Sequence, residues 1–470
     1  MTNGSTGDVL TSLRRWVADH APGERLPSSR SLVAAHHVSA GTVQRAVQTL
    51  ATEGIVESRP GVGTFVRTQA RAHPRDDSWQ TAALRSPRTT GPLVAAALRP
   101  APDGAIAMHS GYPDPLLLPV RLVRSAVARA VRSGDAFDRA PVAGLPHLRA
   151  WFAHELAATS GVDATPPTAN DVVVVPGSQA GLTAVFRSVV PAGRPLLVES
   201  PTYWGAMTAA AQAGVRLVPV PSGPAGPAPA DVARAFDETG ASAFYAQPFV
   251  ANPTGATWSA ETARAVLDVV RVRDAFLVED DWAHDFGIDA SPRPLAALDD
   301  SGHVIYLRSL TKSVSPSLRV AAVVARGPVR QRILADAGAE AMYVSGLLQV
   351  AALDVVTQPG WAAHRRALRL QLQTRRDLLV QSLREHAPTA LVDAVPHGGL
   401  HLWVRLPEGT DVGRLVHDAE SRGLLVTSGD EAFPAEPSGP FVRLGYAGPD
   451  PSAFPTAAGI LHAALRVQER

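Results

Sequence analysis

The stretch SLTKSVSPSLR, residues 309–319, contains Lys312, the only lysine in a chain of 470 residues. The chain has 44 Lys plus Arg, so arginine fills every other basic position. Arginine matches lysine in charge and reach, but a guanidinium group stays protonated, whereas a primary amine can lose its proton and attack an aldehyde. Either the amine of this lysine has a chemical role, or the lysine has been retained by chance. The surrounding sequence has to distinguish these two possibilities.

Short apolar runs alternate with helical segments from about residue 105 onward. The runs are DVVVVPG, RPLLVES, VRLVPVPS, SAFYAQP, AFLVEDD, HVIYLRS and VAAVVARG. Runs of this length, each followed by turn residues or a helix, are typical of fully buried strands in a largely parallel sheet. From about residue 365, a long helical segment and the strand-like LHLWVRLP and FVRLGYA predict a smaller α+β subdomain. We therefore predict an α/β domain over residues 105–470.

The first 67 residues follow a different pattern. DVLTSLRRWVADH, SSRSLVAAHH and VSAGTVQRAVQTLATEG predict three helices, the last with Ser39 as its N-cap and Gly54 at its end. IVESRPGVGTFVRT alternates apolar and polar residues around RPGVG, which predicts a hairpin. Residues 68–104 have little pattern and are rich in Arg, Pro, Thr and Ala, so we predict a linker there.

Composition and charge narrow the possible functions. With 46% hydrophobic and 19% charged residues, the chain resembles ordinary soluble proteins. It has no cysteine, which excludes disulfides and thiolate metal sites, and we predict no metal. There is no signal-like N-terminus and no apolar run near the roughly 18 residues of a membrane span, so we expect a cytoplasmic protein without a membrane partner. Residues 1–100 hold 12 Arg against 7 Asp plus Glu, which makes this end the candidate for nucleic-acid binding.

The segments LPSSRSL, VSAGTVQRAVQTLATEG and GVGTFV resemble the GntR-type DNA-binding domain, a winged helix-turn-helix. The resemblance implies that the third helix enters the major groove of a double-stranded DNA operator. The residues implied to lie at the DNA are Arg30, Ser39, Thr42, Gln44, Arg45 and Gly63. Many relatives have arginine where this chain has Ala40, so the family does not give the operator sequence.

Four further motifs occur in the large domain, each near the end of a predicted strand. They are PGSQAG (176–181), SPTYWG (200–205), ANPTG (251–255) and VEDDWAHDF (278–286). In PGSQAG a buried strand turns into a helix, so the free backbone N–H groups of Ser178 and Gln179 point at an anion. In VEDDWAHDF, acidic residues end a strongly apolar run, which disfavours a simple solvated loop.

Together with SLTKSVSPSLR, these motifs resemble the fold-type I aminotransferases, which hold pyridoxal 5′-phosphate (PLP) as a Schiff base. The resemblance covers roughly residues 105–468. It implies that Lys312 forms the Schiff base, that Asp280 pairs with the pyridinium nitrogen, and that Arg443 holds an effector carboxylate. The other implied cofactor contacts are Ser178, Gln179, Tyr203, Asn252, Trp282, Ser309, Thr311 and Arg319.

The resemblance also assigns roles to several of these contacts. Tyr203 would stack on the pyridine ring, Asn252 would bond its 3′ oxygen, and Arg319 would pair with the phosphate. Trp282 stands where relatives usually have tyrosine. An indole N–H can donate one hydrogen bond but cannot shuttle a proton, so we expect PLP binding to survive while efficient turnover is disfavoured.

The whole chain thus resembles a MocR-type regulator of the GntR family. The resemblance implies a homodimeric, PLP-dependent transcriptional regulator that senses an amino compound, or PLP itself, through the Lys312 aldimine. One alternative is a working PLP-dependent aminotransferase that carries a DNA-binding appendage, so the sequence leaves enzymatic activity uncertain. A third possibility, a scaffold without cofactor, would require the single lysine to be coincidence.

Overall fold

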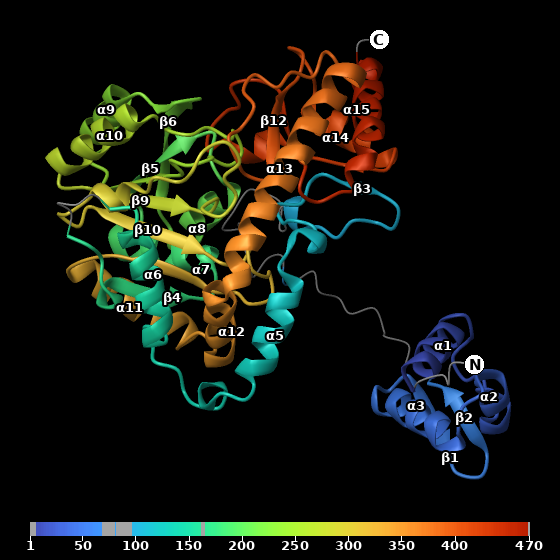
Figure 1. The fold of residues 1–470 in the computed structure, drawn as a ribbon. Coiled ribbons are helices and arrows are strands. Elements are labelled where there is room, and N and C mark those ends of the chain that lie inside the picture. Colours follow the sequence, from blue (N-terminus) through green and yellow to red (C-terminus); the bar gives the residue numbers. More distant parts are fainter. Residues whose placement is uncertain (1–5, 68–79, 81–95, 161–164, 469–470) are drawn as a thin grey trace. The chain divides into compact units, whose positions relative to one another are not determined.

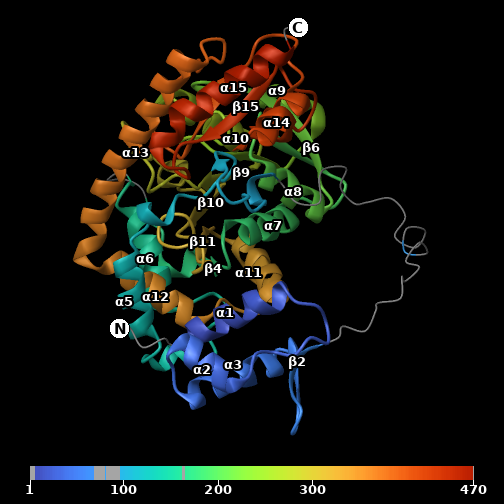
Figure 2. The same cartoon turned by 90° about the vertical axis from the view of Figure 1, so that its right-hand side faces the viewer.

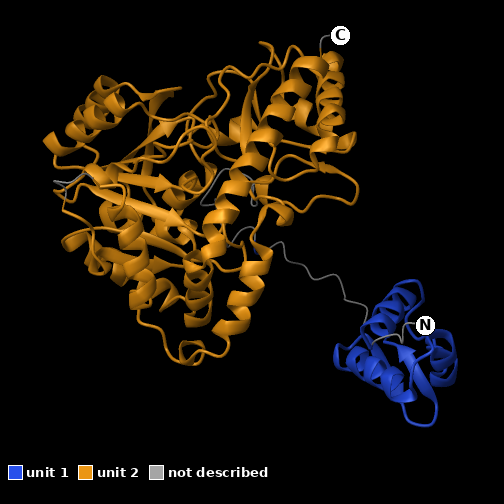
Figure 3. Ribbon diagram, viewed as in Figure 1, with its two compact units in different colours: residues 1–87 blue, residues 88–470 orange. Residues whose placement is uncertain are grey.

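The chain folds into two compact units, residues 1–87 (unit 1) and residues 88–470 (unit 2), shown in Figure 3. The computed structural model describes residues 6–67, 80, 96–160 and 165–468. Most of the predicted linker, 68–104, lies outside these described residues. No helix among them is long and apolar enough to span a membrane.

Unit 1 contains three helices and a hairpin, as the sequence predicted. The helices are α1 (Thr6–Ala18), α2 (Ser29–His36) and α3 (Ala40–Thr52). Strands β1 (Val56–Arg59) and β2 (Gly63–Val66) pair antiparallel to form the hairpin. A small core joins these elements, and it consists of Val9, Leu13, Leu26, Leu32, Val43, Ala46, Leu50, Val56 and Val66.

Unit 2 is built around an eight-stranded sheet in the order β4-β11-β10-β9-β8-β5-β6-β7. Its strands are β4 (Val172–Val175), β5 (Pro195–Ser200), β6 (Arg216–Gly223), β7 (Gly226–Pro227), β8 (Ala243–Ala246), β9 (Phe276–Asp281), β10 (Val304–Ser309) and β11 (Ala321–Val324). All seven predicted apolar runs form strands of this sheet. Only β11 and the short β7 run antiparallel to their neighbours, so the prediction of a largely parallel sheet is confirmed.

Helices cover both faces of this sheet (Figures 1 and 2). One face packs against α7 (Ser178–Val189), α8 (Trp204–Ala213) and α11 (Pro328–Ala341). The other packs against α5 (Val120–Ala130), α6 (Pro146–Ala157), α9 (Pro229–Thr239), α10 (Ala260–Val272) and α12 (Gly346–Thr357). In β4, Val173 and Val175 enter the first core while Val172 and Val174 enter the second. This two-sided burial explains why β4 is apolar at every position.

A smaller part of unit 2 follows the long helix α13 (Pro359–His386). It has a three-stranded sheet of β12 (His401–Arg405), β15 (Phe441–Gly445) and β14 (Thr427–Ser428), in that order. Helices α14 (Val412–Ser421) and α15 (Phe454–Gln468) pack in one core with this sheet and with α13 (Figure 1). The predicted α+β subdomain is therefore present.

The sequence did not predict that the start of unit 2 also packs with this smaller part. Strand β3 (Ile106–Ala107) pairs in parallel with β13 (Leu424–Leu425). Arg99 forms an ion pair with Glu420, and its carbonyl oxygen bonds His109 Nε2. Residues 96–104 were predicted to be linker, but this packing begins before residue 105.

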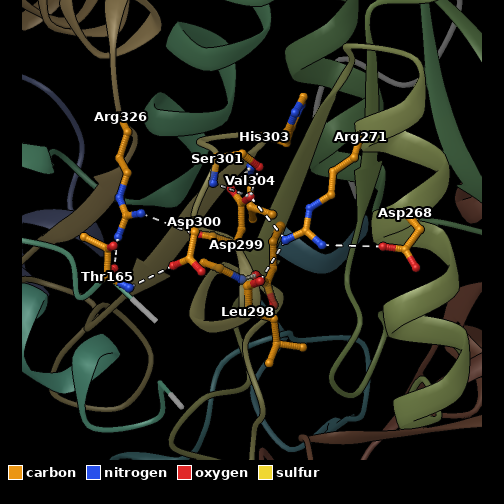
Figure 4. Close-up of polar contacts among 12 residues, drawn as sticks. Thr165, Asp268, Arg271, Leu298, Asp299, Asp300, Ser301, His303, Val304 and Arg326 are labelled. Carbon is orange, nitrogen blue, oxygen red and sulfur yellow. Dashed lines mark hydrogen bonds and ion pairs between the residues drawn. The ribbon is translucent and has the colours of Figure 1, made fainter. Parts of the chain in front are cut away.

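The loop that leads into β10 is fixed by Asp299, which is buried (Figure 4). Its Oδ1 accepts hydrogen bonds from N and Oγ of Ser301, and its Oδ2 accepts one from N of Val304 at 2.8 Å. Arg271 Nη2 lies 3.7 Å from Oδ1 and donates to the carbonyl oxygen of Leu298. Both carboxylate oxygens are therefore paired, and the loop sets where β10, the strand that leads to Lys312, begins.

Candidate functional site

One cavity lies where the strands of the large sheet end. It is lined by Tyr112, Ser178, Gln179, Tyr203, Gln247, Asn252, Asp280, Trp282, Ser309, Thr311, Lys312 and Arg319. Every residue that the sequence implied for cofactor binding is in this set. They meet because parallel strands present their carboxyl ends at one edge of a sheet, where α/β proteins bind ligands. Arg319 joins them from the segment just before the antiparallel β11.

Lys312 lies in the turn after β10 and is half-buried. Burial lowers the pKa of its amine from 10.5 to about 8, although the nearby carboxylate of Asp280 acts in the opposite direction. Its Nζ lies 4.3 Å from the centroid of the Trp282 ring. A fraction of the amine is therefore unprotonated near neutral pH, as a nucleophile requires.

Asp280 lies near the end of β9 and is 2% exposed. Its Oδ2 accepts hydrogen bonds from the Tyr245 hydroxyl at 2.9 Å and from Gln247 Nε2 at 2.8 Å. Its Oδ1 has no partner among the residues that the structure describes. Burial raises the pKa of this carboxyl, and the two hydrogen bonds oppose that rise. The site thus offers a buried acceptor with one oxygen still free.

Gln247 and Tyr245 are functional-site residues that the sequence interpretation missed. Gln247 donates to Asp280, and its Oε1 accepts from the backbone N of Asn252 at 2.8 Å. Tyr112, which also lines the cavity, was missed as well. A usable signal existed for Gln247, because it directly follows strand β8, as Trp282 directly follows β9.

An anion cradle forms where β4 turns into α7, a helix that starts at Ser178. Gly177 has φ of 93°, and a Cβ there would lie 2.3 Å from Arg319 Nη2. That nitrogen also donates to the carbonyl oxygen of Pro176 at 3.2 Å. The missing side chain at Gly177 thus lets a guanidinium lie beside free helix N–H groups, where a phosphate binds well.

The side chain of Gln179 is committed to other contacts. Its Nε2 donates to the carbonyl oxygen of Gly205 at 2.7 Å, and its Oε1 accepts from the Tyr203 hydroxyl at 3.3 Å. Its backbone N–H remains the group suited to an anion. The Gln179 amide therefore positions Tyr203, whose ring faces the same cavity.

Trp282 differs from the role expected for its indole N–H. That N–H donates to the carbonyl oxygen of Val250 at 2.9 Å, so it does not supply a hydrogen bond to a cofactor oxygen. The ring stacks on His401, with centroids 5.8 Å apart, and its face lies beside Lys312. Trp282 therefore belongs to the cavity through its aromatic face alone.

The hydroxyls beside Lys312 have different environments. Ser309 Oγ accepts from the backbone N of Thr311 at 3.1 Å, which stabilises the turn. Thr311 Oγ1 is buried and has no partner within the described part of the chain. Thr311 is thus a second polar group with a free hydrogen-bonding position.

Arg443 lies on β15, in the smaller part of unit 2, and is 3% exposed. Its Nη1 donates to Asn252 Oδ1 at 3.1 Å, and its Nη2 donates to the carbonyl oxygen of His109 at 2.9 Å. Burial lowers the pKa of the guanidinium to about 10. Arg443 therefore reaches the edge of the first cavity through Asn252.

PLP fits these residues. It requires an amine for its aldehyde, an acceptor for its ring nitrogen, an anion site and an aromatic face. Lys312, the free Oδ1 of Asp280, the cradle at Gly177 and the Tyr203 ring provide these groups. No cluster of three or more His, Cys, Asp or Glu suited to a metal occurs among the described residues.

The predicted DNA-binding residues fall into two groups. Arg30, Gln44 and Arg45 are exposed, as direct DNA contacts must be. Ser39 is exposed as well, but it also caps α3, because its Oγ accepts from the backbone N of Thr42 at 3.2 Å and lies 2.9 Å from Thr42 Oγ1.

Packing within unit 1 is enough to explain a glycine at position 63. Its φ is 142°, and a Cβ there would lie 2.6 Å from Arg25 Nε.

Comparisons with known proteins agree with both units. Residues 6–66 match the gntR family of bacterial regulatory proteins, and residues 110–457 match aminotransferase class I and II. The probable rhizopine catabolism regulatory protein MocR of Rhizobium meliloti is 30% identical over 454 residues, which are 95% of this chain and 90% of that protein. The HTH-type transcriptional regulator YdfD of Bacillus subtilis is 26% identical over 435 residues, 90% of this chain and 88% of that protein.

A solved structure gives the same result for unit 2. The crystal structure of LysN, the α-aminoadipate aminotransferase of Thermus thermophilus, in complex with N-(5′-phosphopyridoxyl)-L-leucine, has a TM-score of 0.72 and 26% identity. The match covers 78% of this chain and 93% of that one. The fold and the site thus define a PLP-binding, aminotransferase-like protein with a DNA-binding domain. The chain belongs to the MocR-type regulators of the GntR family.

Proposed function

We propose that this MocR-type regulator binds an operator through unit 1 and senses a small amino compound through PLP held in unit 2. One observation carries the proposal. The only lysine of the chain shares a cavity with a buried carboxylate that has a free oxygen and with a guanidinium at a helix N-terminus. This combination has little use in a purely structural domain.

PLP, when bound, supplies an aldehyde that a primary amine attacks and a ring that withdraws electrons when its nitrogen is protonated. Lys312 provides the amine, and its lowered pKa keeps part of it reactive. Asp280 Oδ1 would accept a hydrogen bond from the protonated ring nitrogen. Ser178 and Arg319 would hold the phosphate, and Tyr203 would pack against the ring.

A small amino compound would place its amine near Lys312 and its carboxylate at Arg443. The ligand then has different contacts in two states of the protein, as any switch requires. Arg443 is suited to transmit this difference. It joins Asn252, which follows the large sheet, to the small sheet and to the backbone of His109.

In unit 1, Arg30, Gln44 and Arg45 contact DNA directly, while Ser39 and Thr42 present the start of α3 to the phosphates. A homodimer would carry two such units and bind two half-sites. We place the protein in the cytoplasm, where DNA and the amino compound are both accessible.

Reductive trapping tests the covalent site directly. The PLP-loaded full chain is treated with borohydride and its peptides are mapped by mass spectrometry. The peptide containing Lys312 should carry the added mass, and the single lysine makes the assignment unambiguous. PLP that stays removable by dialysis after reduction would contradict the proposal.

The alternative is genuine transamination, and the site favours it in one respect. The lowered pKa of Lys312 is also that of a competent base. Against it, the Trp282 N–H is directed at Val250, so this position cannot assist proton transfer. Incubation with an amino acid and a 2-oxo acid distinguishes the two, because a regulator alone would show a spectral change without steady product formation.

A further inference from the structure

A second cavity adjoins the PLP cavity and shares Asn252 with it. Its other walls include Thr202, Trp204, Trp403, Glu431 and Arg443. Thr202 and Trp204 come from the large-sheet part of unit 2, and the remaining three come from the smaller part. A ligand whose amine lies near Lys312 and whose carboxylate is held by Arg443 would extend into this space.

The small sheet arranges one wall of the second cavity. Trp403 on β12 and Thr427 on β14 both pair directly with Arg443 on β15. Directly paired residues on antiparallel strands project from the same face, so the guanidinium lies between an indole and a hydroxyl. Trp403 stacks on Phe441 with centroids 4.9 Å apart and an angle of 9° between the rings, which fixes its orientation.

Trp204 forms part of the facing wall. It begins α8 immediately after Tyr203, and the two rings meet edge to face at 5.4 Å. The backbone N of Thr202 donates to the carbonyl oxygen of Ala432 at 2.8 Å, which ties the two walls together. The aromatic wall of the second cavity therefore continues from the Tyr203 ring, which lines the first cavity.

Glu431 gives the second cavity its negative charge. It lies in the short helix η6 (Gly429–Ala432) and is partly buried. Burial raises the pKa of its carboxyl, while Arg443 and the backbone amide of Ala96 act in the opposite direction. Within the described part of the chain, no basic side chain forms an ion pair with it. A partly buried carboxylate beside two indoles is thus available to a ligand.

We propose that the second cavity recognises a cationic group on the effector, which would make the effector an amino carboxylate with an ammonium or guanidinium group at its far end. The inference rests on the proposed function and adds the class of amino compound. Arg443 and Asn252 take the carboxylate, Glu431 pairs with the distant cation, and the indole faces add cation–π attraction. The same carboxylate disfavours acidic effectors by repulsion.

Spectral titration of the PLP-loaded full chain tests the class. L-Ornithine and L-lysine are the cationic probes, L-norleucine is a neutral probe of similar length, and L-glutamate is the acidic probe. Calorimetry of the same titrations reports binding independently of any turnover. A charged hydrogen bond is worth a factor of roughly 10–100, so a cationic probe should bind at least about tenfold more tightly than norleucine.

Glu431→Gln should reduce that preference by about tenfold or more while leaving norleucine binding nearly unchanged. Glu436→Gln is the matched control, because Glu436 is a nearby but exposed carboxylate. Norleucine binding as tightly as the cationic probes, or an unchanged preference in Glu431→Gln, would overturn the inference alone. A spectrum that no amino compound alters would overturn the proposed function as well.

Discussion

Two buried aspartates lie at opposite ends of the neighbouring strands β9 and β10, and their carboxylates differ in hydrogen bonding. Asp299 precedes β10, and both of its oxygens accept hydrogen bonds, from Ser301 and Val304 (Figure 4). Asp280 lies near the end of β9, and its Oδ1 has no partner among the described residues. Their exposed fractions are almost equal, 4% and 2%. Burial therefore does not distinguish them, but the free oxygen does.

An unpaired buried carboxylate oxygen costs folding free energy, so its presence needs a reason. For Asp299 the protein itself supplies all hydrogen-bond partners, and the residue stabilises the loop before β10. For Asp280 a bound ligand would supply the missing partner of Oδ1. We extend this distinction to other residues. We expect substitution of a polar side chain that has an unused hydrogen-bonding atom to weaken ligand binding. We expect substitution of one whose hydrogen-bonding atoms all have partners in the protein to lower the free energy of unfolding.

Lys312→Arg tests the group with the most specific chemistry, and we expect the largest effect. Guanidinium keeps the charge but cannot condense with the PLP aldehyde, so the visible absorption of lysine-bound PLP should disappear completely. The response to amino compounds should disappear with it. DNA binding measured without effector should change far less, and a variant that still absorbs and responds would refute the central assignment.

The pH dependence of PLP uptake by the PLP-free protein should follow the Lys312 amine. Because burial lowers its pKa to about 8, the uptake rate should rise about tenfold per pH unit below that value and level off above it. An unperturbed lysine would keep accelerating toward pH 10. The same shift predicts that stability rises with pH between about 8 and 10.5, because the unfolded chain then binds more protons. Stopped-flow absorbance and denaturation curves measure the two effects.

Asp280→Asn and Asp299→Asn are matched substitutions at opposite strand ends of the large sheet. Asp280→Asn should weaken PLP binding by roughly 10–100-fold, because a neutral amide no longer pairs with a protonated ring nitrogen. Asp299→Asn should leave PLP affinity unchanged but lower the free energy of unfolding by about 1–3 kcal/mol, because an NH2 group then faces backbone donors. PLP titration and chemical denaturation of both variants measure this, and equal effects on PLP would refute the distinction.

The fold could be predicted from the sequence largely because its signals are local. Most of the apolar runs are buried on both faces, although β6 is not, and each motif stands at a strand end, so sequence order alone brings the cavity residues together. The direction of the Trp282 N–H could not be predicted, because its acceptor, Val250, follows a different strand. The roles of Gln247 and Tyr245 likewise depend on contacts between strands distant in the sequence. The pairing of β3 with β13 joins segments more than three hundred residues apart.

Arg45→Ala extends the distinction to unit 1. Arg45 is exposed and forms no ion pair within the described residues, whereas Arg14 pairs with Glu53. Arg45→Ala should weaken operator binding several-fold and, if Arg45 meets a phosphate, reduce the salt dependence by about one counterion. Arg14→Ala is the control and should change operator binding much less. Neither variant should alter PLP content. Equal losses of DNA affinity in the two variants would show that total positive charge determines binding, and not whether the arginine is free of an ion pair.

Of these substitutions, Ser39→Ala should have the smallest effect. It should lower the stability of unit 1 and leave operator binding nearly unchanged. The sequence implied a DNA contact, but Ser39 Oγ already accepts from the backbone N of Thr42 and also bonds Thr42 Oγ1. Losing this N-cap should lower the stability of unit 1 by about 1 kcal/mol. Ser28→Ala, which removes the equivalent cap of α2, should cost a similar amount. Operator affinity, measured well below the unfolding temperature, should fall less than in Arg45→Ala. A loss as large as in Arg45→Ala with unchanged stability would show that Ser39 contacts DNA directly.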